Sequence, residues 1–370
     1  MTPALPLQDA HAEQLDCFQV NLAALAARHH GPHVALGFGA TLGFAAAPRL
    51  HGLPSVEPHL DAHLASADAH LGLHVDARWH VAPGAYATLL PDGRDAVYVI
   101  ADAFHLPWVP YCGQQHMEHS FIIERGDDGL RVTDHYWNDT QWGPARPGSW
   151  RLSQAELAAA VCDGAHVIAF TPHALARPMP EPRYAAPASA DVEAYLAAYR
   201  GHADRATALA QLTLETWLLA RSRRLHVTLR TWCGEDPARW SDMLREWRAV
   251  VEQTYLALRR VQRGHPEPGA VLDRLAALLA SEPASFAAPT FFERVAAEVA
   301  AVLRVDAAAL RAGEPFTIAP TFSSFRIVEI VERLEERLGV SFDPDDLVPE
   351  NLHRLDDLCR IARLNVKEPT

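Results

Sequence analysis

The clearest hydrophobic pattern lies near the C-terminal end of the chain, where apolar residues recur at helical spacing. The pattern follows a serine pair, Ser323–Ser324, and its apolar positions are Phe325, Val328, Val331, Leu334 and Leu338. Acidic residues occupy much of the remainder. This spacing predicts a helix from about Ser324 to Leu338, and Gly339 suits the left-handed conformation that often ends a helix.

Two further helices are predicted around this segment. Thr290 and Glu293 form a capping-box pattern for a helix that runs through Leu303. A long loop with glycine and prolines separates it from the helix after the serine pair, and a last helix is expected at about 355–364. These three helices and one long first loop fit a four-helix domain, which is the fold predicted for residues 288–370.

This layout resembles that of an acyl carrier protein, and about residues 288–366 carry the resemblance. In that family the serine that opens the second helix carries 4'-phosphopantetheine, whose thiol holds an acyl or aminoacyl group. The resemblance makes Ser324 the attachment site, and a helix N-terminus suits a phosphodiester. The family's usual aspartate before the serine is replaced by Ser323, so a slip to Ser323 stays open, as does simple helix capping without modification.

Acidic residues outnumber basic ones in this C-terminal region, as is usual for carrier proteins. We expect its glutamates, Glu329, Glu332, Glu335 and Glu336, to face partner enzymes that carry basic patches. The resemblance implies two such partners: a phosphopantetheinyl transferase and an acyl- or amino acid:carrier-protein ligase.

The first 175 residues show mixed helix and strand patterns. A helix is expected at about 17–29 and another after Ser153, with strands at 96–101, 121–124, 130–134 and 166–171. A proline-rich linker at 177–187 leads to a region of about 189–281 that is predicted to be a helical bundle. Its tryptophans are expected in the core: Trp217, Trp232, Trp240 and Trp247.

The composition of the chain excludes some classes of binding partner and indicates a cellular compartment. The net charge of −13 argues against nucleic acid and anionic membranes as partners. No apolar run is long enough to span a membrane, and the N-terminal residues lack the pattern of a signal peptide. The five cysteines are scattered without a CxxC pair, so neither a disulfide framework nor a zinc knuckle is indicated. A cytoplasmic location is expected.

One cysteine is placed for chemistry. Asp16-Cys17 opens the first predicted helix, and a glycine-rich turn at 37–43 follows that helix. The dipole and the free N–H groups of a helix start lower the pKa of a thiol and can help to hold an oxyanion. Cys17 is therefore a candidate nucleophile.

A histidine and an aspartate complete the candidate group. His119 opens an apolar strand, a Gly126–Gly129 turn follows, and the returning strand ends at Asp134. In such a hairpin residues 119 and 134 come level near the same end, so a carboxylate can bind one imidazole nitrogen while the other faces a thiol. Asn138 is an alternative orienting residue.

The order cysteine, histidine and then aspartate or asparagine is that of papain-like folds. More narrowly, residues 15–172 resemble the butirosin-type aminoglycoside acyltransferases, which pass an aminoacyl group from a carrier protein to an amine. The matching motifs are Asp-Cys before a glycine-rich turn, and Asp-x-Phe-x-Leu-Pro leading to His-x-x-His and a distal Asp. The resemblance implies Cys17 as nucleophile, His119 as base and Asp134 as orienter. The chain is also similar to a bacterial family associated with amino acid:carrier-protein ligases.

Other assignments stay open at this point. Cys112 is the rival nucleophile, and Cys17 can instead be a core residue. Gln14 and Gln8 lie at spacings from the cysteine that do not fit the oxyanion glutamine of papain-like enzymes. His116 and His119 can bind a metal only with Asp102 or Glu118, and no HExxH pattern supports one, so no metal is predicted.

The predicted fold class is α+β, in three domains: a papain-like α/β domain at 1–176, a helical domain at 188–282 and a four-helix carrier-like domain at 288–370. The predicted function is transfer of an acyl or aminoacyl group from a phosphopantetheine thioester, through a cysteine acyl-enzyme, to an amine or hydroxyl of a small-molecule acceptor. Two alternatives are a thioesterase or amidase of the same fold, and a non-catalytic scaffold that presents the carrier domain to a separate ligase.

Overall fold

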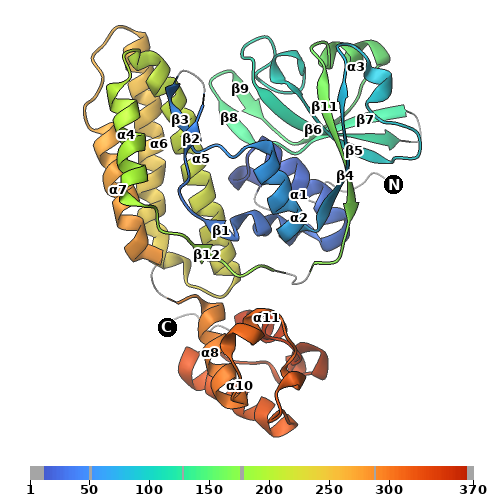
Figure 1. The fold of residues 1–370 in the computed structure, drawn as a ribbon, viewed down its shortest axis with the longest axis vertical. Helices are drawn as coiled ribbons and strands as arrows, with labels where there is room; N and C mark the ends of the chain where they lie inside the picture. The colour runs from blue at the N-terminus through green and yellow to red at the C-terminus, as the bar shows by residue number, and fades with distance from the viewer. Residues whose placement is uncertain (1–11, 50–51, 127–128, 176–178, 287–288, 365–370) are drawn as a thin grey trace. The chain divides into compact units, whose positions relative to one another are not determined.

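The computed structural model describes residues 12–49, 52–126, 129–175, 179–286 and 289–364, and it has a mixed α+β structure (Figure 1). Two compact units are present. The first consists of the described residues of Met1–Phe38 and Pro58–Leu175, and the second of those of Gly39–Glu57 and Ala176–Thr370. Residues 39–57 fall within the predicted domain at 1–176 but belong to the second unit, because apolar side chains of this segment are buried with those of the helical region.

A six-stranded sheet forms the centre of the first unit. All of its pairings are antiparallel, in the order β10-β7-β6-β5-β11-β4. The strands are β4 (Leu73–Val81), β5 (Ala96–Asp102), β6 (Glu118–Gly126), β7 (Gly129–Asp134), β10 (Gly148–Arg151) and β11 (Ala165–Pro172). Strands β5 and β6 lie inside the sheet and contain runs of five buried residues, which explains their continuous apolar sequences.

Helices α1 (Cys17–His30) and α2 (Leu60–Leu71) pack against each other, and they contact strands β6 and β4 respectively (Figure 1). The four predicted strands and the helix that starts at residue 17 are confirmed. Helix α2 and strand β4 were not predicted. Strand β4 lies at the sheet edge and alternates between more and less exposed positions, a period-two pattern that the sequence does contain.

Short elements connect the main ones in the first unit. They are η1 (Ala12–Gln14), η2 (Pro32–Gly39), η4 (Tyr86–Thr88), η5 (Ala103–His105), β8 (Asn138–Thr140), β9 (Gly143–Ala145) and α3 (Gln154–Ala160). Ser153 and Glu156 make the capping box that the sequence predicts for α3. The predicted turn between β6 and β7 falls partly on residues 127–128, which lie outside the described residues, but Gly126 pairs with Gly129 on either side of them.

Four helices form the first part of the second unit. They are α4 (Ser189–Gly201), α5 (Arg205–Trp232), α6 (Ser241–Gln262, preceded by η6, Pro237–Trp240) and α7 (Val271–Phe286). The strands β1 (Thr41–Leu42), β2 (Ala47–Pro48), β3 (Pro54–Ser55) and β12 (Arg183–Tyr184) accompany them. Part of the predicted linker at 177–187 lies outside the described residues, and β1 pairs with β12 in the part that is described.

The tryptophans of these helices divide into two groups. Trp240 and Trp247 are buried, each beneath an arginine guanidinium, and Arg223 binds Glu282 through two hydrogen bonds of 2.7 and 2.9 Å. Trp232 is 37% exposed and Trp217 is partly exposed, so the prediction that all four tryptophans lie in the core is wrong. Both lie on α5, whose buried positions are at other points of the helical repeat.

Residues 290–364 fold around a separate hydrophobic cluster. The helices are α8 (Phe291–Leu303), α9 (Ala307–Arg311), α10 (Ser324–Leu338) and α11 (Leu355–Leu364), with turns η7 (Phe316–Ile318), η8 (Pro344–Asp346) and η9 (Pro349–Asn351). The Thr290 capping box, the bounds of α10 and the left-handed Gly339 are confirmed.

The buried face of α10 differs from the predicted stripe. Phe325 is 88% exposed and Val328 is 55% exposed, whereas Ile330 and Leu334 are buried. The buried positions follow the line of Ile327, Ile330, Val331, Leu334 and Leu338, which packs on the cluster formed with α8 and α11. The first apolar residues after the serine pair therefore form part of the protein surface.

None of the described helices combines the length and the apolar character needed to cross a membrane.

Candidate functional site

Cys17 is the first residue of helix α1, as the sequence predicts. Asp16 caps the helix: its Oδ1 accepts a hydrogen bond of 2.8 Å from the Gln19 N–H, and its own N–H donates to the Gln19 side chain. This reciprocal capping box fixes where the helix begins. Cys17 is 8% exposed, and its side chain lies at the positive end of the helix dipole, which favours an anion there.

The start of α1 is held against the start of strand β6. The Cys17 thiol lies 4.0 Å from the carbonyl oxygen of Glu118, the residue before His119. On the other side of the histidine, the Ser120 hydroxyl donates a 2.5 Å hydrogen bond to the Cys17 carbonyl. Two contacts therefore join residue 17 to the neighbours of His119, from a distance of about one hundred residues in the sequence.

His119 and Asp134 form a buried pair. The His119 Nε2 lies 2.7 Å from Asp134 Oδ2, and the exposed fractions of the two side chains are 0% and 3%. His119 Nδ1 is also buried, and no residue in the described part of the chain forms a hydrogen bond with it. Because Asp134 holds Nε2, Nδ1 is the nitrogen that remains to exchange a proton with a nearby thiol.

The strand register refines the predicted hairpin geometry. Ile122 pairs with Thr133, so Asp134 lies diagonally across from His119 and not level with it. The two residues are on the same face of the sheet, where diagonal neighbours are within reach of long side chains. The expectation that residues 119 and 134 come level is therefore wrong by two positions, although their side chains meet.

Both oxygens of the Asp134 carboxylate have hydrogen-bond partners. Its Oδ1 accepts hydrogen bonds from the Tyr136 N–H at 2.9 Å and from the Asn21 side chain at 3.1 Å. Burial alone raises the pKa of Asp134, but the positive charge of His119 and these hydrogen bonds outweigh it, so the pKa lies below its usual value. The carboxylate is thus kept ionised as a partner for the imidazole.

Asn21 connects all three elements of the site and was not assigned a role from the sequence. Its side-chain nitrogen donates to the Ser120 carbonyl at 2.9 Å as well as to Asp134, and its oxygen accepts the His135 N–H at 2.9 Å. Asn21 is fully buried. An asparagine one helical turn after the cysteine, on an otherwise apolar face, was the available signal.

The residues considered as alternatives for the site lie in different environments. Cys112 is exposed, and the Asn138 side chain donates to the Tyr111 hydroxyl at 3.4 Å, while Asp134 is the partner of His119. His116 is 67% exposed and binds Asp102, whereas His119 is buried and binds Asp134. Gln14 is buried in η1, and Gln8 lies outside the described residues.

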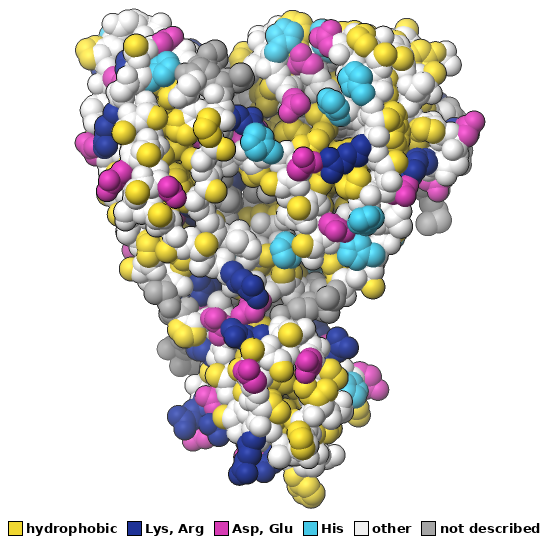
Figure 2. Space-filling view, in the orientation of Figure 1, with side chains coloured by type: hydrophobic (Ala, Val, Ile, Leu, Met, Phe, Trp, Pro, Cys, Tyr) yellow, Lys and Arg dark blue, Asp and Glu magenta, His cyan; other side chains and the backbone are white. Residues whose placement is uncertain are grey.

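Histidine side chains gather on the visible face of the first unit (Figure 2). Among the residues that the structure describes, three residues have ligand atoms within 4.8 Å of one another: His105, Cys162 and Asp163. No sequence motif indicates this group, because nearly sixty residues separate the histidine from the other two.

A second candidate site lies at the start of α10. Ser323 is the helix cap, and its hydroxyl accepts a 3.4 Å hydrogen bond from the Arg326 N–H. Ser324 is the first helical residue, is exposed, and has no hydrogen-bond partner among the described residues. Both serines are exposed, but the Ser323 hydroxyl is engaged in the helix cap, and Ser324 lies in the first turn, whose N–H groups suit a phosphate.

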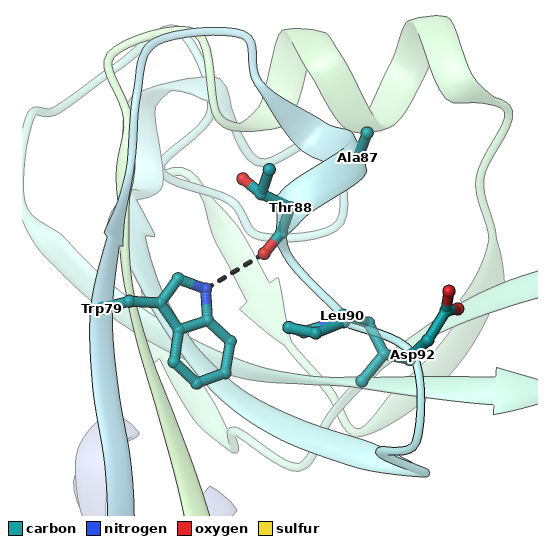
Figure 3. Close-up of a pocket in the computed structure, with 6 residues that line it drawn as sticks. Trp79, Ala87, Thr88, Leu90 and Asp92 are labelled. Atoms are coloured by element: carbon teal, nitrogen blue, oxygen red, sulfur yellow. Dashed lines mark hydrogen bonds between the residues drawn. The ribbon is translucent and has the colours of Figure 1, made fainter.

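A pocket in the first unit lies apart from these residues. It is lined by Trp79, Ala87, Thr88, Leu90, Pro91 and Asp92, and the Trp79 indole donates a 3.0 Å hydrogen bond to the Thr88 carbonyl (Figure 3). The lining contains no thiol, imidazole or amine, so it lacks the residue types of the Cys17–His119–Asp134 group.

The chain was compared with protein-family models, with curated proteins and with solved structures. None of them matches it.

Proposed function

We propose that this protein transfers an acyl or aminoacyl group from a phosphopantetheine thioester to an amine or hydroxyl acceptor, through an acyl-enzyme on Cys17. One observation carries the proposal: a fully buried imidazole with Nε2 bound to Asp134 and Nδ1 without a partner, beside the residue whose carbonyl contacts the Cys17 thiol. A nucleophile, a base and an orienter in this relation are the components of a cysteine triad.

The reaction follows from these roles. His119 Nδ1 accepts the Cys17 proton, and the thiolate attacks the carbonyl carbon of the acyl group to give a tetrahedral oxyanion. In this proposal, N–H groups at the start of α1 other than that of Gln19, which donates to Asp16, would stabilise that charge. As the intermediate collapses, His119 returns the proton to the departing thiolate, which leaves the acyl group on Cys17.

The second half of the reaction uses the same residues in reverse order. The acceptor amine or hydroxyl attacks the Cys17 thioester, His119 removes its proton, and the Cys17 thiolate leaves with the amide or ester product released. Asp134 stays ionised throughout and holds the imidazole in the tautomer that carries its proton on Nε2 in the resting state. The hydrogen bond to Asp134 and the edge contact with the Tyr136 ring limit the rotation of the imidazole.

The α10 region supports the carrier part of the proposal. Ser324 fits the attachment point because its hydroxyl is exposed and unpartnered, while that of Ser323 serves as the helix cap. When bound there, phosphopantetheine supplies a thiol that carries the acyl group. Exposed Phe325 and Val328 and the exposed glutamates of α10 provide a surface for partner enzymes such as a phosphopantetheinyl transferase.

Intact-protein mass spectrometry tests the carrier assignment. The full chain is co-expressed with a phosphopantetheinyl transferase, and the wild type is expected to gain the mass of one phosphopantetheine. Ser324→Ala should lose the addition and Ser323→Ala should keep it. Addition that persists in Ser324→Ala refutes the attachment site.

The acyl-enzyme is tested separately with a small acyl-pantetheine thioester, which does not require a loaded carrier. Peptide mapping should find the acyl group on Cys17, with at least about a hundredfold slower acylation in His119→Gln. Cys112→Ala is the matched control and should react like the wild type. An acyl group on Cys112, or acylation that is unchanged in Cys17→Ala, overturns the mechanism. Release of free acid in the presence of an amine assigns the protein to the hydrolases.

A further inference from the structure

A second cluster of reactive side chains lies in the first unit, outside the residues proposed for acyl transfer. It consists of His105 at the end of η5, and of Cys162 and Asp163 in the turn between α3 and β11. The three donor atoms, one nitrogen, one sulfur and one oxygen, all lie within 4.8 Å of one another. We propose that these residues form a binding site for a divalent transition metal of the zinc class.

The donor set decides the class of metal. A thiolate and an imidazole are preferred by zinc and its neighbours, whereas magnesium and calcium prefer oxygen ligands alone. Metal–ligand bonds of roughly 2.0 to 2.3 Å at tetrahedral angles place donor atoms about 3.3 to 3.8 Å apart. The three donor atoms lie within 4.8 Å of one another, and the 2.8 Å hydrogen bond between His105 Nε2 and Asp163 Oδ2 would lengthen by about 0.5 Å as both atoms bind the metal.

The backbone on each side of the cluster is well defined. Gly164, which follows Asp163, has φ of +92°, and a Cβ atom there would lie 2.8 Å from the Val81 carbonyl oxygen. Only glycine fits this close approach, so the turn that carries Cys162 and Asp163 is fixed against β4. On the other side, Asp102 Oδ1 accepts the N–H groups of Phe104 and Met117 and so fixes η5.

The histidine ring also has neighbours that orient it. The ring of His105 makes edge contacts with those of Phe104 and His116, at centroid distances of 5.2 and 6.2 Å. The side chain of His105 is 25% exposed and that of Asp163 is 62% exposed, so a metal ion can reach the donors from solvent. Three protein ligands leave one tetrahedral position for water.

A metal in this position would join η5 to the α3–β11 turn. Since η5 precedes the segment that leads to His119, the ion would stabilise the part of the sheet on which the imidazole depends. Binding to the folded state alone stabilises that state, and the unfolding temperature then rises roughly with the logarithm of the free metal concentration. This role requires no participation of the metal in acyl transfer.

Cobalt is the probe, because a thiolate bound to Co²⁺ gives a charge-transfer absorption. The full chain carrying Ser324→Ala, which cannot acquire a pantetheine thiol, is stripped of metal and titrated with Co²⁺ and then with Zn²⁺. We expect one equivalent of cobalt, a thiolate charge-transfer band and its displacement by zinc. Mg²⁺ should cause no change.

Variants of two of the three ligands complete the test. Cys162→Ser should abolish the band, and His105→Gln should weaken cobalt binding by at least about tenfold. Cys112→Ser, which changes an exposed cysteine outside the cluster, should bind like the parent. The proposal is overturned by the absence of stoichiometric binding, or by a band that persists in Cys162→Ser and so arises from another thiol.

Discussion

Removal of the Asn21 side chain should loosen the sheet around His119. In Asn21→Ala, the His135 N–H and the Ser120 carbonyl lose their bonds of 2.9 Å, and Asp134 loses one of 3.1 Å. Each buried group left without a partner costs about 1–3 kcal/mol, and the Tyr136 N–H still serves Asp134. We therefore expect a loss of about 3 kcal/mol in the opening free energy of strands β6 and β7.

Hydrogen exchange read by mass spectrometry measures this loss locally, which matters in a chain with two compact units. A loss of about 3 kcal/mol corresponds to exchange of the β6 and β7 amides that is faster by roughly a hundredfold. The amides of α10 should exchange at the wild-type rate. Gln115→Ala, which removes an exposed amide side chain, is the matched control and should change nothing.

The result also bears on the chemistry. Loss of one donor should raise the pKa of Asp134 relative to the wild type, because the Asn21 hydrogen bond lowers it. Acylation of Cys17 should slow, and Asn21→Asp should not restore it, because a second carboxylate beside Asp134 is repulsive. An increase in exchange of less than about fivefold in β6 and β7, or about 1 kcal/mol, would refute the view that Asn21 joins the three elements.

Three further predictions concern stability. Burial lowers the pKa of His135 to about 4, against 6.5 in the unfolded chain, so the neutral imidazole stabilises the fold fully above pH 6.5 and this stabilisation is lost as the pH falls toward 4. Between pH 6.5 and 4, the free energy of unfolding in urea should therefore fall by up to about 3 kcal/mol less for His135→Gln than for the wild type. Equal decreases in the two proteins would contradict this assignment. Glu282→Ala should destabilise the helical region by about 3–5 kcal/mol, because it leaves the Arg223 charge buried without its carboxylate partner. Unfolding followed by tryptophan fluorescence measures this loss. A change below about 1 kcal/mol would show that water replaces the carboxylate. Leu334→Ala should lower the stability of the 290–364 region by about 2–5 kcal/mol, because Leu334 is fully buried. Val328→Ala changes an exposed position of the same helix and should alter the stability by no more than about 0.5 kcal/mol. Equal shifts in the unfolding temperature would mean that the buried face of α10 is wrongly assigned.

Local sequence signals determined much of the architecture. The capping boxes at residues 16, 153 and 290 are short-range patterns, because each cap and its partner lie within one helical turn. The strands β5, β6, β7 and β11 were predictable from apolar runs, and α10 from its helical period. Edge strand β4 was missed even though its alternation is visible, since polar residues at every second position weaken a search for apolar runs.

The candidate site was predictable only in part. The cysteine at a helix start and the histidine at a strand start are local features, and the hairpin brings Asp134 near His119. The diagonal register, the link through Asn21 and the choice of Nε2 for the aspartate are tertiary, because they depend on how α1 packs across two strands. The exposure of Phe325 likewise depends on which side of α10 meets α8 and α11, and periodicity alone does not decide this.

Local patterns along the chain were enough to predict the starts of α1, α3, α8 and α10 and to indicate residue types for the nucleophile, the base and the attachment point. The tertiary structure alone placed His105 beside Cys162 and Asp163, assigned residues 39–57 to the helical core, and left one imidazole nitrogen of His119 buried without a partner. These features differ in how far apart in the sequence the interacting residues lie. Helix capping and periodicity involve residues within a few positions of one another, whereas burial and donor geometry arise only when distant segments pack together.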